Sequence, residues 1–293
     1  YTAKLDWNAS NNHRFQAFYR YIEELNVNNT GLNKFSTVSY TKPPETERYS
    51  FTYWGDLSDK LSVKARYTDY SFVEDAESGG GLIPHFTIDY QTADGSDEIE
   101  FGGEKYRGAN YIEVANETFT FKVDYQMGEH LITAGIESFD GTVTNQFLAR
   151  YNGEVDFASI EDFEAGQWSY LRFQVPAAGV NALDTITANF DVEQLTYYLQ
   201  DQWTVSDVLE LQFGVRVDSL ETPTRPVENA AFAERYGFTN AQAFDYTVVQ
   251  PRASFSYNIS EGIPEESPIS SAIIRGGYGL FMGRFPNVWL GNA

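Results

Sequence analysis

Apolar and polar residues alternate one by one along many short stretches of this chain. The clearest stretch, 209–218, places Leu209, Leu211, Phe213, Val215 and Val217 between Glu210, Gln212, Gly214, Arg216 and Asp218. Because successive side chains of a β-strand point to opposite faces, this period of two predicts a strand with one apolar and one polar face. The preceding stretch, 195–203, alternates less regularly, and a short polar turn at 204–208 joins the two. Together they predict a β-hairpin.

The same pattern predicts four further hairpins. The expected turns lie near residues 11, 59, 129, 206 and 265, and long polar connections at 23–46, 74–117, 140–190 and 219–245 separate the hairpins. The segment AFAERYGF in the last connection predicts a short helix. The chain is thus expected to form about ten strands of roughly 9–11 residues, the length that a tilted strand needs to cross a bilayer.

Short and long connections alternate strictly along the chain. This arrangement is typical of an all-β antiparallel transmembrane β-barrel, with short turns at one rim and long loops at the other. A soluble β-sandwich is the alternative, but its connections need not sort by length. We therefore interpret residues 1–293 as part of one barrel domain. The face that carries Phe119, Phe121, Val123 and Tyr125 should point outward to lipid.

Composition narrows the class of protein further. The 42 acidic residues exceed the 20 Lys and Arg residues, and the resulting net charge of −22 argues against a nucleic-acid partner. Cysteine is absent, which excludes disulfides and thiolate metal sites. The mean hydropathy is −0.40, a value compatible with barrel strands that show half of their side chains to water. No signal peptide is present and the chain opens inside a strand, so we expect an internal piece of a longer protein.

Two stretches carry a resemblance to a known family. The run YYLQDQWTVSDVLELQFGVRVD at 197–218 resembles a strand–turn–strand of TonB-dependent outer-membrane receptors of Gram-negative bacteria. The segment IRGGYGLFMGRFPNVWLGNA at 274–293 is similar to the Oar-like branch of that family. The resemblance implies a barrel of about 22 strands in the cell outer membrane, surrounded by lipid and filled by a plug domain. It also implies uptake of a solute, here of unknown identity, driven by the TonB energy-transducing complex.

This chain would supply slightly under half of such a barrel, without the plug domain, the TonB box or the C-terminal strand. A non-transporting surface barrel, either an adhesin or a secretion-associated porin, is the alternative. An outer-membrane hydrolase that uses His85 near Asp89 is a third possibility, but one histidine in an acidic loop is weak support for catalysis. We therefore expect no enzyme activity, no catalytic residues and no cofactor.

Charged side chains of both signs occupy the polar faces of the predicted strands. They are Lys64, Arg66, Lys122, Asp124, Glu137, Arg216, Asp218, Arg252 and Arg275. In a barrel these residues line the lumen. We favour cross-strand charge pairing over a substrate path as their role, and the resemblance implies that some of them contact the plug.

The long loops supply the candidate ligand-binding residues. These are the aromatic residues Tyr106, Tyr111, Phe163, Trp168 and Tyr170, which lie among many carboxylates. Aromatic rings beside carboxylates suit sugars, peptides or cationic ligands better than bare anions. The alternative is that these rings only pack the loops together.

A metal site is not expected. The carboxylates of loop 74–117 could hold calcium, but DYQTADGSDEIE lacks the EF-hand spacing, and a solvated acidic surface is favoured. His13, His85 and His130 are too far apart in sequence to indicate a zinc site.

Overall fold

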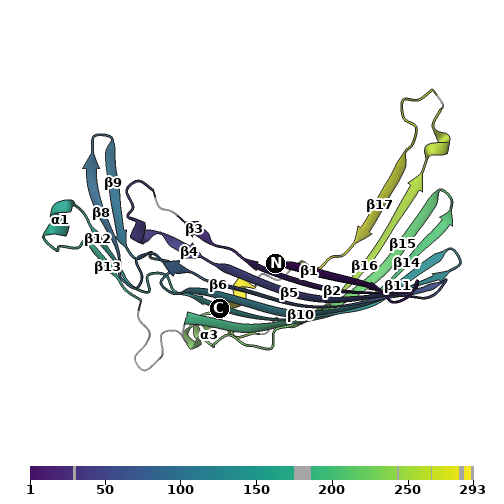
Figure 1. The fold of residues 1–293 in the computed structure, drawn as a ribbon, viewed down its shortest axis with the longest axis horizontal. Helices are drawn as coiled ribbons and strands as arrows, with labels where there is room; N and C mark the ends of the chain where they lie inside the picture. Colours follow the sequence, from purple (N-terminus) through teal and green to yellow (C-terminus); the bar gives the residue numbers. More distant parts are fainter. Residues whose placement is uncertain (29–30, 175–185, 243, 265, 284–286, 292–293) are drawn as a thin grey trace.

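The main element of the computed structural model is one antiparallel sheet of ten strands (Figure 1). The model describes residues 1–28, 31–174, 186–242, 244–264, 266–283 and 287–291. Each strand of this main sheet pairs with the next one along the chain. The strands are β1 (Thr2–Asn8), β2 (His13–Glu23), β5 (Pro44–Ser58), β6 (Leu61–Asp75), β10 (Asn110–Met127), β11 (His130–Phe147), β14 (Thr187–Ser206), β15 (Leu209–Glu221), β16 (Tyr246–Asn258) and β17 (Ile273–Gly279). The predicted antiparallel sheet of about ten strands is confirmed.

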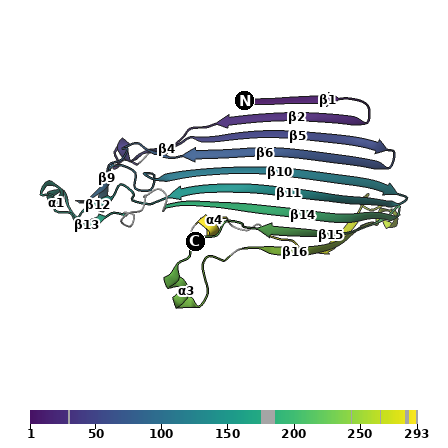
Figure 2. The ribbon, with the colours of Figure 1, turned by 90° about the horizontal axis from the view of Figure 1, so that it is seen from below.

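The two ends of the main sheet differ as the alternation of connections predicts. Short turns join β1 to β2, β5 to β6, β10 to β11 and β14 to β15 at one end, and the longer connections gather at the other (Figure 2). The connection between β16 and β17 also lies at the turn end and includes a 3-10 helix at Ser260–Gly262. The predicted helix in the last long connection is confirmed as α3 (Ala230–Tyr236). The Asn229 side chain caps the start of α3, and Gly237, with φ of 76°, ends it in the left-handed region.

The strands are longer than the sequence pattern predicts. Strands β10 and β11 each have 18 residues and β14 has 20, rather than about 9–11. The predicted loop boundaries at 117, 140 and 190 were therefore wrong. The reason is that polar and apolar side chains exchange faces along the strand. Apolar side chains such as Phe119 point outward near the turn end, whereas towards the loop end Glu113 points outward and Val114 inward. An exposed acidic strand end of this kind resembles a loop in the sequence.

The long connections are themselves folded, which the sequence pattern did not predict. A second sheet has the order β13-β12-β8-β9, and we call it the outer sheet. Its strands are β8 (His85–Thr92), β9 (Gly95–Gly102), β12 (Glu154–Phe157) and β13 (Tyr170–Arg172), and α1 (Ile160–Glu164) follows β12. A small third sheet consists of β3 (Asn26–Asn28), β4 (Tyr40–Lys42) and β7 (Glu77–Ser78), and a 3-10 helix spans Ser36–Val38. Ile88, Val155 and Phe157 form the buried core of the outer sheet.

The apolar face of the main sheet points away from its concave side. Phe119, Phe121 and Tyr125 are 44%, 36% and 43% exposed, and their neighbour in sequence, Thr120, lines a hollow on the opposite, concave face. The predicted outward direction of this face is confirmed. None of the helices among the described residues is long and apolar enough to cross a bilayer.

The concave face changes character along the strands. Near the turn end it is polar, whereas towards the loop end Val143, Phe190, Val192 and Leu220 form a buried apolar cluster. Leu290 of the short helix α4 (Val288–Gly291) packs into this cluster. The concave wall is therefore apolar and covered where α4 rests on it.

Carboxylates stand side by side on the outward face, beyond the aromatic band towards the loop end. The cross-strand register aligns Asp69, Glu117, Asp140, Glu193 and Glu221 on five neighbouring strands, and we call them the acidic row. Like charges that face each other across strands destabilise a sheet. Some of the chain's charge repulsion is therefore concentrated in this row.

Replacing Glu117 by Gln should stabilise the barrel, because Glu117 lies between two carboxylates of the acidic row, Asp69 and Asp140. The expected rise in the melting temperature of the folded protein in detergent is roughly 1–4 °C at low ionic strength. The rise should shrink in salt, which screens exposed charges. Glu113→Gln is the matched control, since Glu113 pairs with Val73 and Thr144. Equal shifts for the two variants would contradict this account of the row.

Candidate functional site

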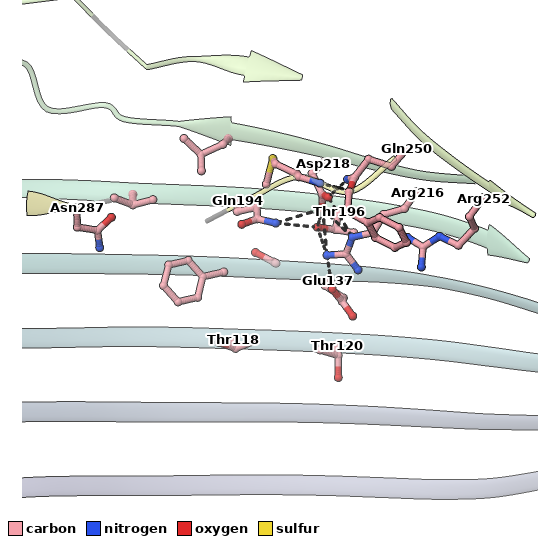
Figure 3. A pocket seen from close by; sticks show the side chains of 17 residues that line it. Thr118, Thr120, Glu137, Gln194, Thr196, Arg216, Asp218, Gln250, Arg252 and Asn287 are labelled. Atoms are coloured by element: carbon pink, nitrogen blue, oxygen red, sulfur yellow. Dashed lines mark hydrogen bonds and ion pairs between the residues drawn. The ribbon is translucent and has the colours of Figure 1, made fainter. Parts of the chain in front are cut away.

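A large hollow lies on the concave face of the main sheet. It has a volume of about 750 Å³. Strands β10, β11, β14, β15 and β16 form its floor, and the segment after β17 contributes Phe281, Met282 and Asn287 (Figure 3). Antiparallel pairing brings these residues together from positions far apart in the sequence.

Asp218 is the centre of the polar network in this hollow. It is 2% exposed and accepts hydrogen bonds from Arg216 Nε at 3.0 Å, Thr196 Oγ1 at 2.5 Å and Gln194 Nε2 at 3.1 Å. Gln250 Nε2 also donates to its second carboxylate oxygen. A buried carboxylate is tolerated only when it is paired and hydrogen-bonded. These four donors meet that condition.

Arg216 connects two carboxylates on different strands. Its Nη2 lies 2.9 Å from Glu137 Oε2 and 3.0 Å from Asp218 Oδ1. The same nitrogen donates to Thr196 Oγ1 at 3.1 Å. The guanidinium group therefore ties β11, β14 and β15 together through its side-chain contacts.

Gln250 and Arg252 connect the network to the segment that follows β17. The backbone N–H of Met282 donates to Gln250 Oε1 at 2.7 Å. The Arg252 guanidinium lies 5.4 Å from the centre of the Phe281 ring, within the range of a cation–π contact. Side-chain contacts therefore hold this segment against the concave wall.

The network contains three of the charged residues that the sequence predicts for the lumen, Glu137, Arg216 and Asp218. The predicted cross-strand charge pairing is confirmed for Arg216 and Glu137. The pairs Arg216–Asp218 and Lys122–Asp124, the latter with 2.6 Å between Nζ and Oδ2, each lie within one strand. Sequence analysis missed the uncharged partners Gln194, Thr196 and Gln250. The alternation of each strand places these three side chains on the lumen face. Only the pairing between strands shows that they converge on the carboxylate of Asp218.

The predicted ligand-binding residues do not form one cluster. Tyr106 follows β9 and lies between two cations, 5.7 Å from Lys105 Nζ and 5.6 Å from Arg150 Cζ. Tyr111 is in strand β10 rather than in a loop, because the outward alternation continues to Asn110, and its hydroxyl donates to Glu113 Oε2 at 2.7 Å. No interaction between Tyr111 and the other four candidates is seen in the described parts of the chain.

Of the other three candidates, Tyr170 begins strand β13 of the outer sheet, and Phe163 and Trp168 lie between β12 and β13. Phe163 of α1 makes edge contacts with Phe101 at 5.6 Å and Phe157 at 5.1 Å between ring centres. These contacts favour a packing role for Phe163. Trp168 and Tyr170 are 57% and 43% exposed. Both remain accessible to a ligand.

His85 is a structural residue of the outer sheet. It is 1% exposed, and its Nδ1 donates to the carbonyl oxygen of Gly103 at 3.0 Å. Its Nε2 lies 3.6 Å from Glu100 Oε2. Because the ring is shielded from solvent, it cannot meet a substrate. No group of acidic or histidine residues that could hold a metal ion is found in the described portion of the chain.

A buried ion-pair cluster connects the outer sheet to its neighbouring loops. Glu154 accepts hydrogen bonds from Lys105 Nζ at 3.1 Å and from Arg150 Nε. Burial alone would raise the pKa of Glu154, but the hydrogen bonds from Arg150 and Lys105 outweigh burial and hold its pKa below the usual value. The pKa of Arg150 is raised in turn by the hydrogen bond to Glu154. The charged pair therefore stabilises this part of the fold.

The outer sheet should loosen in acid because of Glu154. A carboxyl whose folded-state pKa is lowered stabilises the fold above its unfolded-state pKa, about 4.3. This contribution is lost as the pH falls through the folded-state value. Amide exchange in β8 and β12, corrected for the intrinsic rate, should therefore become faster as the pH falls from about 5 to 3. Glu154→Gln should remove this pH dependence of amide exchange. Identical pH profiles for the wild type and the variant would refute the assigned role of Glu154.

The fold and the polar concave face define an outer-membrane β-barrel wall. The chain belongs to the outer membrane beta barrel domain family, whose model matches residues 1–292. The main sheet therefore lies in the outer membrane, with its aromatic face towards lipid and its concave face towards the lumen. No curated protein sequence matches the chain at a significant level.

Solved structures of outer-membrane transporters share this fold. The ferric-catecholate import receptor Fiu of Escherichia coli, in its closed form, aligns with a TM-score of 0.59 at 11% identity, over 89% of this chain and 41% of Fiu. The outer membrane transporter YddB of Escherichia coli aligns with a TM-score of 0.54 at 15% identity, over 88% and 29%. The copper transporter OprC aligns with a TM-score of 0.52 at 8% identity, over 98% and 37%. The chain thus spans less than half the length of each of these proteins.

Proposed function

We propose that this chain is part of the barrel of a TonB-dependent receptor for energised uptake of a solute. The observation that carries the proposal is the main sheet itself, whose ten strands follow the barrel fold of transporters and of an import receptor. The run at 197–218, which forms most of the β14–β15 hairpin, and the segment at 274–293 add the resemblance to the Oar-like branch. The plug domain and the remaining strands would be supplied by other parts of the parent protein.

The outer sheet would act at the entrance of this receptor. It lies at the loop end of the main sheet (Figure 1), the end that faces the medium in an outer-membrane barrel. The exposed rings of Trp168 and Tyr170 and the ring of Tyr106 would supply stacking surfaces for a solute. We assign Phe163 and Tyr111 a smaller part, since their contacts lie within the fold.

Binding of the full-length parent protein to the periplasmic domain of TonB tests this proposal. We expect a saturable complex, because energised uptake requires contact with the energy-transducing complex. A strain that lacks the gene should also leave one solute in its medium that the wild-type strain removes. A protein that shows neither property would instead be a non-transporting surface barrel, such as an adhesin or a secretion-associated porin.

A further inference from the structure

Four cations lie close together on the lumen face, outside the hollow described above. They are Arg14 on β2, Lys64 and Arg66 on β6, and Lys122 on β10, and we call them the basic strip. The register places Arg14, Trp54, Lys64 and Lys122 next to one another on four neighbouring strands. Arg66 pairs with Thr120, which lines the hollow. The strip therefore faces the same lumen as the hollow.

The basic strip has very little negative charge of its own. Among the described residues, only Lys122 of the four cations has a carboxylate within ion-pair distance, that of Asp124. Arg14 lies 4.0 Å and Lys64 5.6 Å from the centre of the Trp54 ring. Arg66 uses its Nε to donate to Thr52 Oγ1 at 3.1 Å. Arg14 also interacts electrostatically with Asp6. These contacts position the cations and leave the charge of Lys64 and Arg66 without a paired carboxylate among the described residues.

The neighbouring cations of the basic strip repel one another, and an anion bound in the lumen would relieve this repulsion. Lys64 and Lys122 are direct cross-strand neighbours, and like charges in that position destabilise a sheet. The chain carries a net charge of −22, but its acidic row lies on the outward face. Positive charge is thus retained on the lumen wall in a chain that has carboxylates in excess.

We infer that the basic strip is a lumen subsite for the anionic groups, phosphate or carboxylate, of the solute that the receptor takes up. This inference rests on the proposed function and adds the chemical class of the solute. Arg66 has its terminal guanidinium nitrogens available for paired hydrogen bonds to two oxygens of such a group. Lys64, two positions from Arg66 on β6, and Lys122 on the neighbouring strand β10 add two ammonium groups beside it.

The acidic loop end limits what kind of anion can reach the strip. Exposed Asp94, Asp97 and Glu98 of the β8–β9 hairpin would slow the approach of a compact polyanion from the medium, without lowering its equilibrium affinity for the strip. A larger solute whose anionic groups are only part of its structure can meet the aromatic residues of the outer sheet first and the basic strip afterwards. The two surfaces thus act on different parts of one solute.

The test measures binding of citrate and of inorganic pyrophosphate to the full-length protein in detergent by calorimetry at low ionic strength. Citrate carries carboxylates only and pyrophosphate carries phosphates only, so the pair also separates the two kinds of anionic group. In the double variant Lys64→Gln/Arg66→Gln, binding of at least one probe should weaken by about tenfold or more, because two charge-assisted contacts are lost. Added salt should weaken the wild-type binding as well.

Two further variants keep the test decisive. Lys60→Gln removes an exposed lysine from the β5–β6 turn, four positions from Lys64, and should leave the affinity within about twofold of wild type. The charge-retaining variant Lys64→Arg/Arg66→Lys should keep most of the binding even if the glutamine variant folds poorly.

Two results would overturn the inference. They are the absence of saturable binding of either probe to the wild-type protein, and equal affinity in the wild type and the glutamine variant. If the variant in the second case is also less stable than the wild type, the strip is a docking surface for a protein segment in the lumen. The TonB experiment measures a protein–protein complex and not anion binding, so failure here is distinguishable from failure of the proposed function.

Discussion

Replacing Arg216 by alanine is expected to lower the free energy of unfolding by about 3–5 kcal/mol. The change leaves Asp218, which is 2% exposed, without its cationic partner. Glu137 loses its ion pair as well. Hydrogen bonds from Thr196, Gln194 and Gln250 remain, but uncharged donors compensate a buried carboxylate only in part. Denaturant unfolding of the full-length protein in detergent or lipid vesicles measures the effect.

Arg252→Ala is the matched control for this prediction. Arg252 lines the same hollow, yet among the described residues its interaction is with the Phe281 ring and not with a carboxylate. We expect its removal to cost about 1 kcal/mol or less. Asp218→Asn combined with Arg216→Ala should recover part of the loss, since it removes the unpaired charge. A cost for Arg216→Ala no larger than that for Arg252→Ala would show that the network does not stabilise the barrel wall.

Replacing Phe121 by arginine is expected to destabilise the barrel in a bilayer by about 2–4 kcal/mol. Phe121 points outward among the apolar side chains of Val123, Ile136 and Tyr197, so the new charge would face the lipid hydrocarbon. Thr118→Arg on the same strand is the control, because Thr118 lines the hollow on the concave, lumen face. Folding yield in lipid vesicles should fall for the Phe121 variant and stay near wild type for the control. Similar yields would mean that this face does not contact lipid.

The turn half of the main sheet could be predicted from the sequence because each strand there carries its own alternation. Phe119, Phe121 and Tyr125 alternate with polar residues, and Gly128 marks the turn at which the pattern restarts. Gly128 has φ of 60°, a value that glycine adopts without strain. Over this half of the sheet, the alternation within each strand gives the same inward and outward faces as the pairing between strands. The strands could therefore be located without knowledge of side-chain packing or of long-range pairing.

The loop half could not be predicted, because its structure depends on pairings between distant segments. Strand β12 pairs in parallel with β8, so that Glu154 lies opposite His85, and no local pattern indicates such a pair. Val114, Phe190 and Leu220 point inward because α4 covers them, which reverses the alternation that a wet lumen would produce. The candidate site also depends on pairings between distant segments. Asp218 and Arg216 were predicted as lumen residues, but the convergence of Gln194 and Gln250 on Asp218 required the cross-strand register.

The alternating outward and inward directions of the side chains of strand β10 provide the most direct test of the barrel assignment. The described chain contains no free cysteine and the sequence has none, so single cysteines at positions 118–125 each give one labelled site in this part of the parent protein. With a fluorescent label and the full-length protein in lipid vesicles, quenchers attached to lipid chains should act on labels at positions 119, 121, 123 and 125. A water-soluble quencher should act on labels at positions 118, 120, 122 and 124. Quenching that does not alternate between neighbouring positions, or that alternates in the opposite phase, would contradict a barrel wall with lipid on its aromatic face and water on its polar face.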